Sequence, residues 1–443
     1  MLTTPFLSEL DSRAAVKGSR DPLGVQSIWS RFGRRVVGNL TTVSSSVRDF
    51  TVMMLGYYFA ERVAEEGCDQ GELTTFLKWE QLAAYARARV HDEHGFRGTE
   101  RVWRRLNEDE RASLGVHANA QILGNQKTYG LWGLYTVPGR ASGLIEGDPS
   151  RLTSAARELV ERSYLPLLAR GPHRDERSVI ERLMRADGTL DLRPNSKDAN
   201  LLDAVGAVLA NFGQRERGFY REHLLYGGPN DMRPGDGTGG KQRVLAELLV
   251  ETLVDPTWSV TPKSMATLAS RARQRKGAGP ELAEDLDRIR TCELVLAPGT
   301  AFFEHMLGCD GQAPKVIAAQ VEKHWGSAPR ATIDLAATEG IEWEPRGSDD
   351  GAIGARWMRL ARMFHSGEYE TALAVTLDQN AAVMKARAAA APWATVKEGK
   401  VHVSFRDEHL SNLPSGAELP EYWRHAYFIA SLRDVAAAIE GHA

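Results

Sequence analysis

The sequence predicts a mainly α, multi-domain helical protein with a central winged-helix-like region and a small C-terminal β-hairpin. Three observations support this fold class. Apolar residues recur at the three-four spacing of helices along most of the chain. Residues Asn119–Glu161 contain an amide-rich stretch, a short turn-rich hairpin and a capped helix, which is the order of parts in a winged helix. Alternating apolar residues after the Glu398–Gly399 turn predict a hairpin over residues 393–405.

The chain has 443 residues, which is too many for one ordinary core, so we expect two or three domains. Residues 170–200 are charged and interrupted by glycine and proline, which favours a boundary there. We therefore expect an N-terminal helical region at 1–68, a winged-helix-like domain at 69–170 and a helical C-terminal domain at 195–443.

One helix is expected to be buried on nearly every side. It follows the capping residues Ser44–Ser46, has Asp49 in its first turn and extends to about Glu66. Apolar residues surround most of its circumference, so it should pack against several neighbours. Further helices are expected at 28–37, 73–90, 99–107, 155–164, 201–226, 242–254, 261–276, 280–296, 301–308, 314–325, 353–364, 369–391 and 421–440.

The charge balance limits the kind of nucleic-acid contact that is possible. The chain has 55 basic and 58 acidic side chains, for a net charge of −3. A protein that coats nucleic acid over its whole surface should be more basic, so any contact must come from local patches.

Cysteine usage and hydropathy favour a cytoplasmic protein without a membrane partner. Cys68, Cys292 and Cys309 are odd in number and widely spaced, which predicts neither disulfides nor a zinc site. The longest apolar run, Val52–Ala60, is too short to span a bilayer. The first residues lack a basic region before an apolar run, so we expect no signal peptide.

The winged-helix-like region is the predicted nucleic-acid interface, with duplex DNA as the expected ligand. In such domains the third helix enters the major groove, where amides and lysine read base edges or hold phosphates. The residues expected to contact nucleic acid are Arg97, Arg101, Arg104 and Arg105 in the second helix; Asn119, Gln121, Asn125, Gln126 and Lys127 in the third; and Arg140 and Arg151 in the wing. Residues Gly130–Leu134 interrupt the third helix at its end, which departs from the pattern. Winged helices also dock proteins, so that alternative stays open.

A second basic face is expected on the helix at 261–276. No acid occurs between Asp255 and Glu281, so the sequence shows no local neutralisation. Contact with phosphates is one interpretation, and cations favoured at a helix C-terminus are the other. The face comprises Lys263, Arg271, Arg273, Arg275 and Lys276.

Three other motifs do not carry a site. Gly235–Lys241 fits GxxxxGK, but Gln242 stands where magnesium needs Ser or Thr, and no buried strand precedes it. His91–His94 are four consecutive polar residues at a helix end, which is a poor arrangement for a metal. Glu398–Lys400, similar to half of a nuclease motif, lies in a tight turn. We expect no cofactor and no metal, and assign no catalytic residue.

Two segments resemble stretches in uncharacterised proteins of bacterial antiviral defence islands. They are Asp21–Phe32 (DPLGVQSIWSRF) and Tyr422–Val435 (YWRHAYFIASLRDV). The order of an N-terminal helical part, a winged-helix-like middle and a helical C-terminal half is also similar. The resemblance implies an accessory or sensing subunit that acts with a helicase, ATPase or nuclease encoded nearby. It transfers no catalytic residues.

Together these features predict a non-enzymatic nucleic-acid-binding or sensing subunit with protein partners in a larger complex. Two alternatives stay open. One is a metal-dependent nuclease whose acids come from scattered positions, and the other is a scaffold that uses the winged helix for protein docking.

Overall fold

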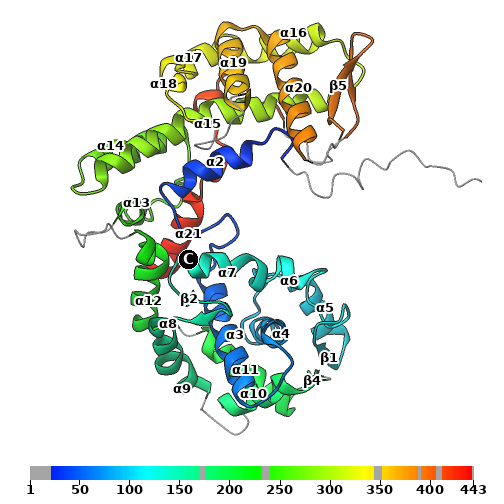
Figure 1. Ribbon diagram of the computed structural model, residues 1–443, viewed down its shortest axis with the longest axis vertical. Coiled ribbons are helices and arrows are strands. Elements are labelled where there is room, and N and C mark those ends of the chain that lie inside the picture. The colour runs from blue at the N-terminus through cyan, green and yellow to red at the C-terminus, as the bar shows by residue number, and fades with distance from the viewer. Residues whose placement is uncertain are drawn as a thin grey trace, which may run out of the picture. The chain divides into compact units, whose positions relative to one another are not determined.

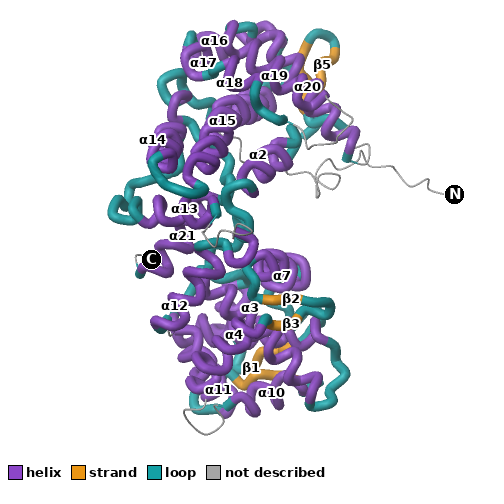
Figure 2. The backbone as a smooth tube through the Cα atoms, turned by 60° about the vertical axis from the view of Figure 1, so that its left-hand side comes forward, coloured by secondary structure: helices purple, strands orange, loops and turns teal. Residues whose placement is uncertain are grey.

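Helices form most of this protein in its computed structural model, and the strands are short (Figures 1 and 2). The structure describes residues 21–168, 175–186, 188–210, 212–231, 240–343, 352–387, 391–405 and 412–441. Within these ranges the strands form three separate two-stranded antiparallel sheets. The mainly α fold class is therefore confirmed.

The chain divides into two compact units. Unit 1 comprises residues 1–36 and 257–427, and unit 2 comprises residues 37–256 and 428–443. This division differs from the predicted domains, whose boundaries near residue 68 and at 170–195 fall inside unit 2. None of the described helices is long and apolar enough to cross a membrane.

Unit 2 is built around two long helices, α3 (Val47–Glu65) and α4 (Glu72–His91). Ser46 caps α3 as predicted, since its hydroxyl accepts from the backbone N–H of Asp49. The helices approach closely where α3 carries Gly56, because a Cβ there would lie 2.7 Å from the Phe76 ring. The Trp79 indole N–H donates to the carbonyl oxygen of Val52 at 2.8 Å, which fixes the helix pair in register.

Around this pair, unit 2 contains further helices and two small sheets. The helices are α5 (Thr99–Glu108), α6 (Gln126–Tyr129), α7 (Leu131–Ala141), α8 (Ser154–Leu159), η1 (Val160–Tyr164), α9 (Leu165–Leu168), α10 (Glu176–Met184), α11 (Lys197–Ala210), α12 (Gln214–Tyr220), η2 (Arg221–Leu225), η3 (Gly228–Asp231), α13 (Lys241–Val250) and α21 (Ile429–Glu440). Strand β1 (Arg111–Leu114) pairs with β4 (Gly188–Asp191), and β2 (Ile145–Glu146) pairs with β3 (Arg151–Leu152).

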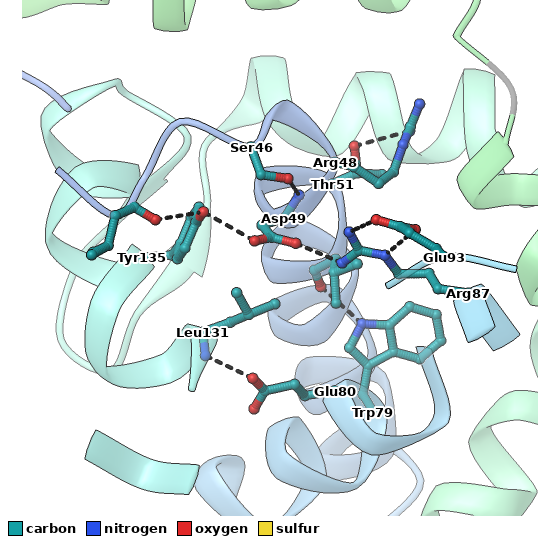
Figure 3. A network of polar contacts seen from close by, with 12 residues as sticks. Ser46, Arg48, Asp49, Thr51, Trp79, Glu80, Arg87, Glu93, Leu131 and Tyr135 are labelled. Atoms are coloured by element: carbon teal, nitrogen blue, oxygen red, sulfur yellow. Dashed lines mark hydrogen bonds and ion pairs between the residues drawn. The ribbon is translucent and has the colours of Figure 1, made fainter. Parts of the chain in front are cut away.

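A buried polar network connects α3, α4 and α7 (Figure 3). The Asp49 carboxylate accepts from Arg87 at 2.5 Å through Oδ1 and from the Tyr135 hydroxyl at 3.0 Å through Oδ2. Arg87 also donates to Glu93, and this bond helps to hold the chain after α4. The two carboxylates raise the pKa of Arg87 despite its burial, so the guanidinium stays charged.

Unit 1 is organised around the 29-residue helix α15 (Gly279–Leu307). Figure 1 shows α15 beside α14 and beneath α19. The remaining elements are α2 (Val25–Arg34), α14 (Pro262–Arg273), α16 (Pro314–Trp325), α17 (Ala328–Thr332), α18 (Leu335–Glu339), α19 (Ala352–Ser366), α20 (Tyr369–Ala386), β5 (Ala394–Lys397), β6 (Lys400–Val403) and η4 (Leu419–Glu421). The predicted hairpin at 393–405 is confirmed by the β5–β6 pairing.

Several predicted elements differ from the structure. The closing helix begins at Ile429 and not at 421, because the chain before it takes left-handed backbone angles at Tyr427 and Phe428. The predicted helix at 201–226 is interrupted between α11 and α12. Residues 280–296 and 301–308 belong to one helix, α15, which continues through Pro298.

Candidate functional site

The amide-rich segment of unit 2 is a loop and not the third helix that the sequence predicts. Between β1 and α6 the chain forms turns and bends, and α6 is a single turn. The amide side chains bond the nearby backbone, which competes with helix formation. Gln121 donates to the Val116 carbonyl at 2.6 Å and accepts from the Gln126 N–H at 3.0 Å, while Asn125 caps α6 by accepting from Thr128. We call residues 115–129 the amide loop.

Two arginine side chains of α5 donate hydrogen bonds to backbone carbonyls of the amide loop. Arg101 donates from Nη1 to the carbonyl oxygens of Gln121 at 2.8 Å and Leu123 at 3.2 Å. Arg105 donates to the carbonyl oxygens of Ala120 at 3.1 Å and Gln121 at 3.2 Å, and also to that of Asn119. Their guanidinium groups are therefore used inside the protein, so the prediction that they contact phosphates is not supported by their positions.

Gln126 is also an internal residue. Its side chain is fully buried, with Nε2 donating to Glu80 at 2.8 Å and Oε1 accepting from Gln81 at 2.9 Å. Glu80 accepts a second bond at 2.7 Å from the Leu131 N–H, at the start of α7. Burial raises the pKa of Glu80 to about 7 against these hydrogen bonds. Gln126 thus joins the amide loop to α4 and cannot reach a ligand.

Arg97 lies near the same buried acids. It is partly buried and lines a cavity of about 10 Å³ together with Asp49, Glu80 and Arg87. Its positive charge acts to lower the pKa of Glu80, opposing the effect of burial. The structure therefore gives Arg97 an electrostatic role within unit 2.

The outward side of the amide loop carries the other predicted residues. Asn119, Asn125 and Lys127 are exposed on the loop, together with His117 and Tyr129, which were not among the predicted residues, and Arg104 is exposed on α5. Tyr129 is 60% exposed, an unusual state for a large aromatic side chain. The structure brings amides, one lysine and one aromatic ring to a single short loop.

A cavity of about 580 Å³ borders the amide loop. It is lined by residues of the loop, the α3–α4 connection, α4, β1, the end of α10 and β4, including His117, Asn119, Lys78 and Thr189. Lys78 is buried, and its ammonium donates to Gln70 at 2.6 Å and to the Arg185 carbonyl at 2.8 Å. No local sequence pattern indicates this cavity, because it depends on the long-range pairing of β1 with β4.

The predicted wing is present as the two-residue strands β2 and β3. Thr153 follows the wing and caps α8, and its hydroxyl also donates to the Gly143 carbonyl at 2.9 Å. Arg140 is exposed and donates to the Ser150 hydroxyl at 2.6 Å, and Arg151 is exposed on β3. The wing and the amide loop lie at opposite ends of α7, which has 11 residues and hence a length of about 16 Å.

The sheets differ from a winged helix. Strand β1 comes after α5 and pairs with β4, so it does not extend the β2–β3 hairpin. The helix that directly precedes the wing is α7, whose exposed residues Gly133, Val137 and Arg140 carry little base-reading chemistry. The interruption predicted at Gly130–Leu134 is in fact the start of α7.

The second basic face lies on α14 and the turn after it in unit 1. Thr261 and Ser264 form a capping box, and Pro262 is at the first helical position, as predicted. The cations Lys263, Arg273, Arg275 and Lys276 are exposed, and Arg271 is partly buried. The expectation of no local neutralisation is wrong, because Asp287 of the neighbouring helix α15 forms an ion pair with Arg273.

The described residues of the three motifs that were not assigned a site make contacts or turns within the fold. At His91–His94, the His91 ring bonds the Gly206 carbonyl at 2.8 Å, and Glu93 pairs with Arg87. Within the described ranges no group of three or more His, Cys, Asp or Glu side chains could hold a metal ion. Glu398–Gly399 forms the β5–β6 turn, with both residues at positive φ.

Residues 235–239 of the GxxxxGK motif lie outside the described residues. Its end is visible, since Lys241 begins α13 and Gln242 is buried. Gln242 donates to the Asn39 side chain at 2.7 Å and to the Leu224 carbonyl at 3.0 Å. Gln242 therefore serves packing in unit 2.

Comparison with known proteins adds no relative. No protein-family model, no curated protein and no solved structure matches this chain.

Proposed function

We propose that the protein is a non-enzymatic nucleic-acid-binding or sensing subunit, and that the amide loop of unit 2 is its contact surface. The observation that carries this proposal is the arginine clamp beneath the loop. Arg101 and Arg105 bond the backbone carbonyls of residues 119, 120, 121 and 123, which fixes the course of the loop and with it the positions of its exposed side chains.

A clamped loop loses little conformational freedom when it binds. When a flexible loop becomes ordered on binding, the loss of conformational entropy reduces the binding free energy. A loop that is already ordered avoids this cost and binds more tightly. The exposed Asn119 side chain can donate and accept, as contacts to base edges require, and the exposed Asn125 amide can donate while its Oδ1 caps α6. The exposed ring of Tyr129 can stack on an unpaired or terminal base.

The cations around the loop are few, which sets an expectation for salt dependence. Arg104 and Lys127 are exposed near the loop, and Arg140 and Arg151 are exposed at the wing. If all four contact phosphates of a duplex, a plot of the logarithm of the binding constant against the logarithm of the salt concentration should have a slope of about −3.6, at roughly 0.9 per phosphate. The expected ligand stays duplex DNA, bound by a local patch.

Binding is tested by fluorescence anisotropy of a labelled duplex and the matching single strand against the full chain at low salt. Lys127→Glu combined with Tyr129→Ala should weaken binding at least tenfold without changing the thermal unfolding midpoint. The matched control is Lys315→Glu, an equal charge change at an exposed site of α16 in unit 1, which should leave binding unchanged. Arg101 is unsuitable for this test, since its loss would disturb the loop itself.

The role in a defence complex rests on the resemblance of Asp21–Phe32 and Tyr422–Val435 to proteins of defence islands. In that setting a helicase, ATPase or nuclease would supply the chemistry, and this chain would supply recognition. Cleavage of the same labelled DNA by the purified chain with magnesium would favour the alternative of a metal-dependent nuclease.

One observation favours protein docking as a second function. Val137 on α7 is 70% exposed. It lies four residues after Gly133 and three before Arg140, so the three exposed residues share one face of the helix. An exposed apolar side chain on a helix suits a protein partner better than phosphates. Val137→Asp should leave DNA affinity unchanged and should abolish co-purification with a product of a neighbouring gene if this face docks that protein.

A further inference from the structure

A buried carboxylate of unit 2, that of Glu80 in α4, bonds both sides of the junction between α6 and α7. Its Oε2 accepts from the Gln126 side-chain amide at 2.8 Å, and its Oε1 accepts from the Leu131 backbone N–H at 2.7 Å. Figure 3 shows the second of these bonds. At Gly130, between the two, a Cβ would lie 2.7 Å from Oε1, so the chain passes closer to the carboxylate than a larger residue would allow. Glu80 therefore joins the α6–α7 junction to α4.

The bond to Gln126 also connects Glu80 to the amide loop. The Gln126 Oε1 accepts from the Ile122 backbone N–H at 3.3 Å and from Gln81 of α4 at 2.9 Å. Its Nε2 donates a second bond to the Leu77 carbonyl oxygen at 3.1 Å. Both N–H groups and the carbonyl oxygen of this amide are therefore used inside unit 2. A change in the charge of Glu80 acts directly on the contact between the loop and α4.

The surroundings of Glu80 compensate an ionised carboxylate poorly. Glu80 is 3% exposed, and both groups that donate to it are neutral. The adjoining cavity has a volume of about 10 Å³, which is room for about one water molecule at most. A buried charge without a paired cation or hydration is costly, so the fold favours the neutral, protonated carboxyl.

The other charged side chains that line this cavity are Asp49 of α3, Arg87 of α4 and Arg97 in the segment before α5. Burial raises the pKa of Glu80 to about 7, and the like charge of Asp49 acts in the same direction. Arg97 acts in the opposite direction, while Arg87 is paired with Asp49. Tyr135 of α7 donates to Asp49 and has a raised pKa, so it stays neutral in this range. The carboxyl of Glu80 therefore gains and loses its proton near neutral pH.

We propose that Glu80 makes the amide loop a pH-dependent switch. The loop lies closed against α4 while the carboxyl is protonated, and the α6–α7 junction opens more often once the carboxylate ionises. In the open state water reaches the carboxylate and hydrates its charge. Because the closed state binds the proton more tightly than the open state does, a rise in pH favours opening.

The effect of this switch on recognition rests on the proposed function, in which the closed amide loop is the form that binds nucleic acid. Apparent affinity is reduced in proportion to the fraction of chains in the binding-competent state. A rise in pH should therefore weaken recognition by unit 2 to the extent that it populates the open loop. The opening itself is a property of the free protein and does not depend on any ligand.

The test is amide hydrogen exchange of the full chain without nucleic acid, read by mass spectrometry at Gly130 and Leu131. After division by the intrinsic rate, exchange of these amides should rise about thirtyfold from about pH 5.5 to about pH 8, for a group that titrates at about 7 when closed and 4.5 when open. Glu80→Gln keeps an oxygen acceptor but does not titrate, so its corrected exchange should be independent of pH. This comparison also separates Glu80 from His117, an exposed histidine of the loop. The matched control Glu108→Gln, at an exposed carboxylate of α5, should behave as wild type.

The switch is contradicted by wild-type exchange that does not depend on pH after correction, or by Glu80→Gln with the pH dependence of wild type. It is also contradicted if Leu131 and the amides at the centre of α3 have the same opening constant, because only global unfolding would then expose Glu80. If Glu80→Gln does not fold, Arg97→Gln decides the matter. It removes a cation that lowers the pKa of Glu80, so the rise in exchange should move to higher pH, and an unmoved rise overturns the proposal. DNA binding is measured separately, so the switch and the proposed function can fail independently.

Discussion

Arg101 donates a hydrogen bond from Nη1 to the backbone carbonyl oxygen of Gln121 at 2.8 Å, and so a side chain expected on the surface instead supports the loop above it. Arg105 acts in the same way one helical turn later. Guanidinium groups suit this task because their donors lie in a rigid plane and can meet several carbonyls at once. The amide loop therefore depends on α5 for its shape.

Arg105→Ala should destabilise unit 2 by about 2–3 kcal/mol, because it removes charged hydrogen bonds and leaves buried or partly buried carbonyls without a donor. Urea denaturation followed by circular dichroism measures this change. Arg104→Ala on the same helix is the matched control. Its side chain is exposed, so its effect should stay within about 0.5 kcal/mol. Equal effects of the two substitutions would show that the clamp does not stabilise the loop.

Arg87→Met should be among the most damaging single changes in unit 2. It leaves the Asp49 carboxylate buried without its cation, at a cost of about 3–5 kcal/mol. The double variant Arg87→Met with Asp49→Asn should recover much of that loss, since it removes the uncompensated charge. Additive losses in the double variant, measured by denaturant unfolding, would contradict the ion-pair account.

Glu80 should make stability fall as the pH rises. Its pKa is about 7 in the folded protein against an ordinary value of 4.5, so between these values the folded state keeps a proton that the unfolded chain has lost. The free energy of unfolding should then decrease by about 3 kcal/mol from about pH 4.5 to about pH 7, relative to a chain without this group.

Glu80→Gln supplies that reference, because glutamine does not titrate. The free energies of unfolding of wild type and variant are measured by urea titration across this pH range. Their difference, wild type minus variant, should decline with rising pH. A difference that stays constant or grows would mean that Glu80 ionises normally in the folded protein.

Thr153→Ala should weaken the connection between the wing and α8. The hydroxyl caps α8 and also donates to the Gly143 carbonyl, so its loss should cost about 1–2 kcal/mol. Thermal unfolding measures the loss. Thr153→Ser retains the hydroxyl and should remain near wild type, and a serine variant as unstable as the alanine variant would exclude the capping explanation.

Local signals in the sequence predicted much of the helical structure. Ser46 caps α3, Thr261 and Pro262 begin α14, and the β5–β6 hairpin forms around the Glu398–Gly399 turn. These features depend on neighbours within a few residues. Tertiary pairings were not predictable in this way: β1 pairs with β4 across more than seventy residues, and this pairing depends on packing that no local pattern encodes.

In the candidate sites, too, exposed residues were predictable from the local sequence, and residues that make tertiary contacts were not. Residues Asn119, Asn125 and Lys127 were predicted as surface contacts and are exposed. Arg101, Arg105 and Gln126 have the same polar composition in the sequence but bond inward, because they lie opposite backbone carbonyls and Glu80 in the folded chain. The buried contact between Glu293 and His425 was not predictable, because the two residues are separated by 132 positions in the sequence.

The most direct test of the central claim is the affinity of the full chain for a labelled DNA duplex at low salt, measured by fluorescence anisotropy. The amide-loop account predicts measurable binding, a loss of at least tenfold for Lys127→Glu with Tyr129→Ala, and no change for Lys315→Glu. Absence of binding by wild type to duplex and single strand alike, or equal binding by all three proteins, would contradict it.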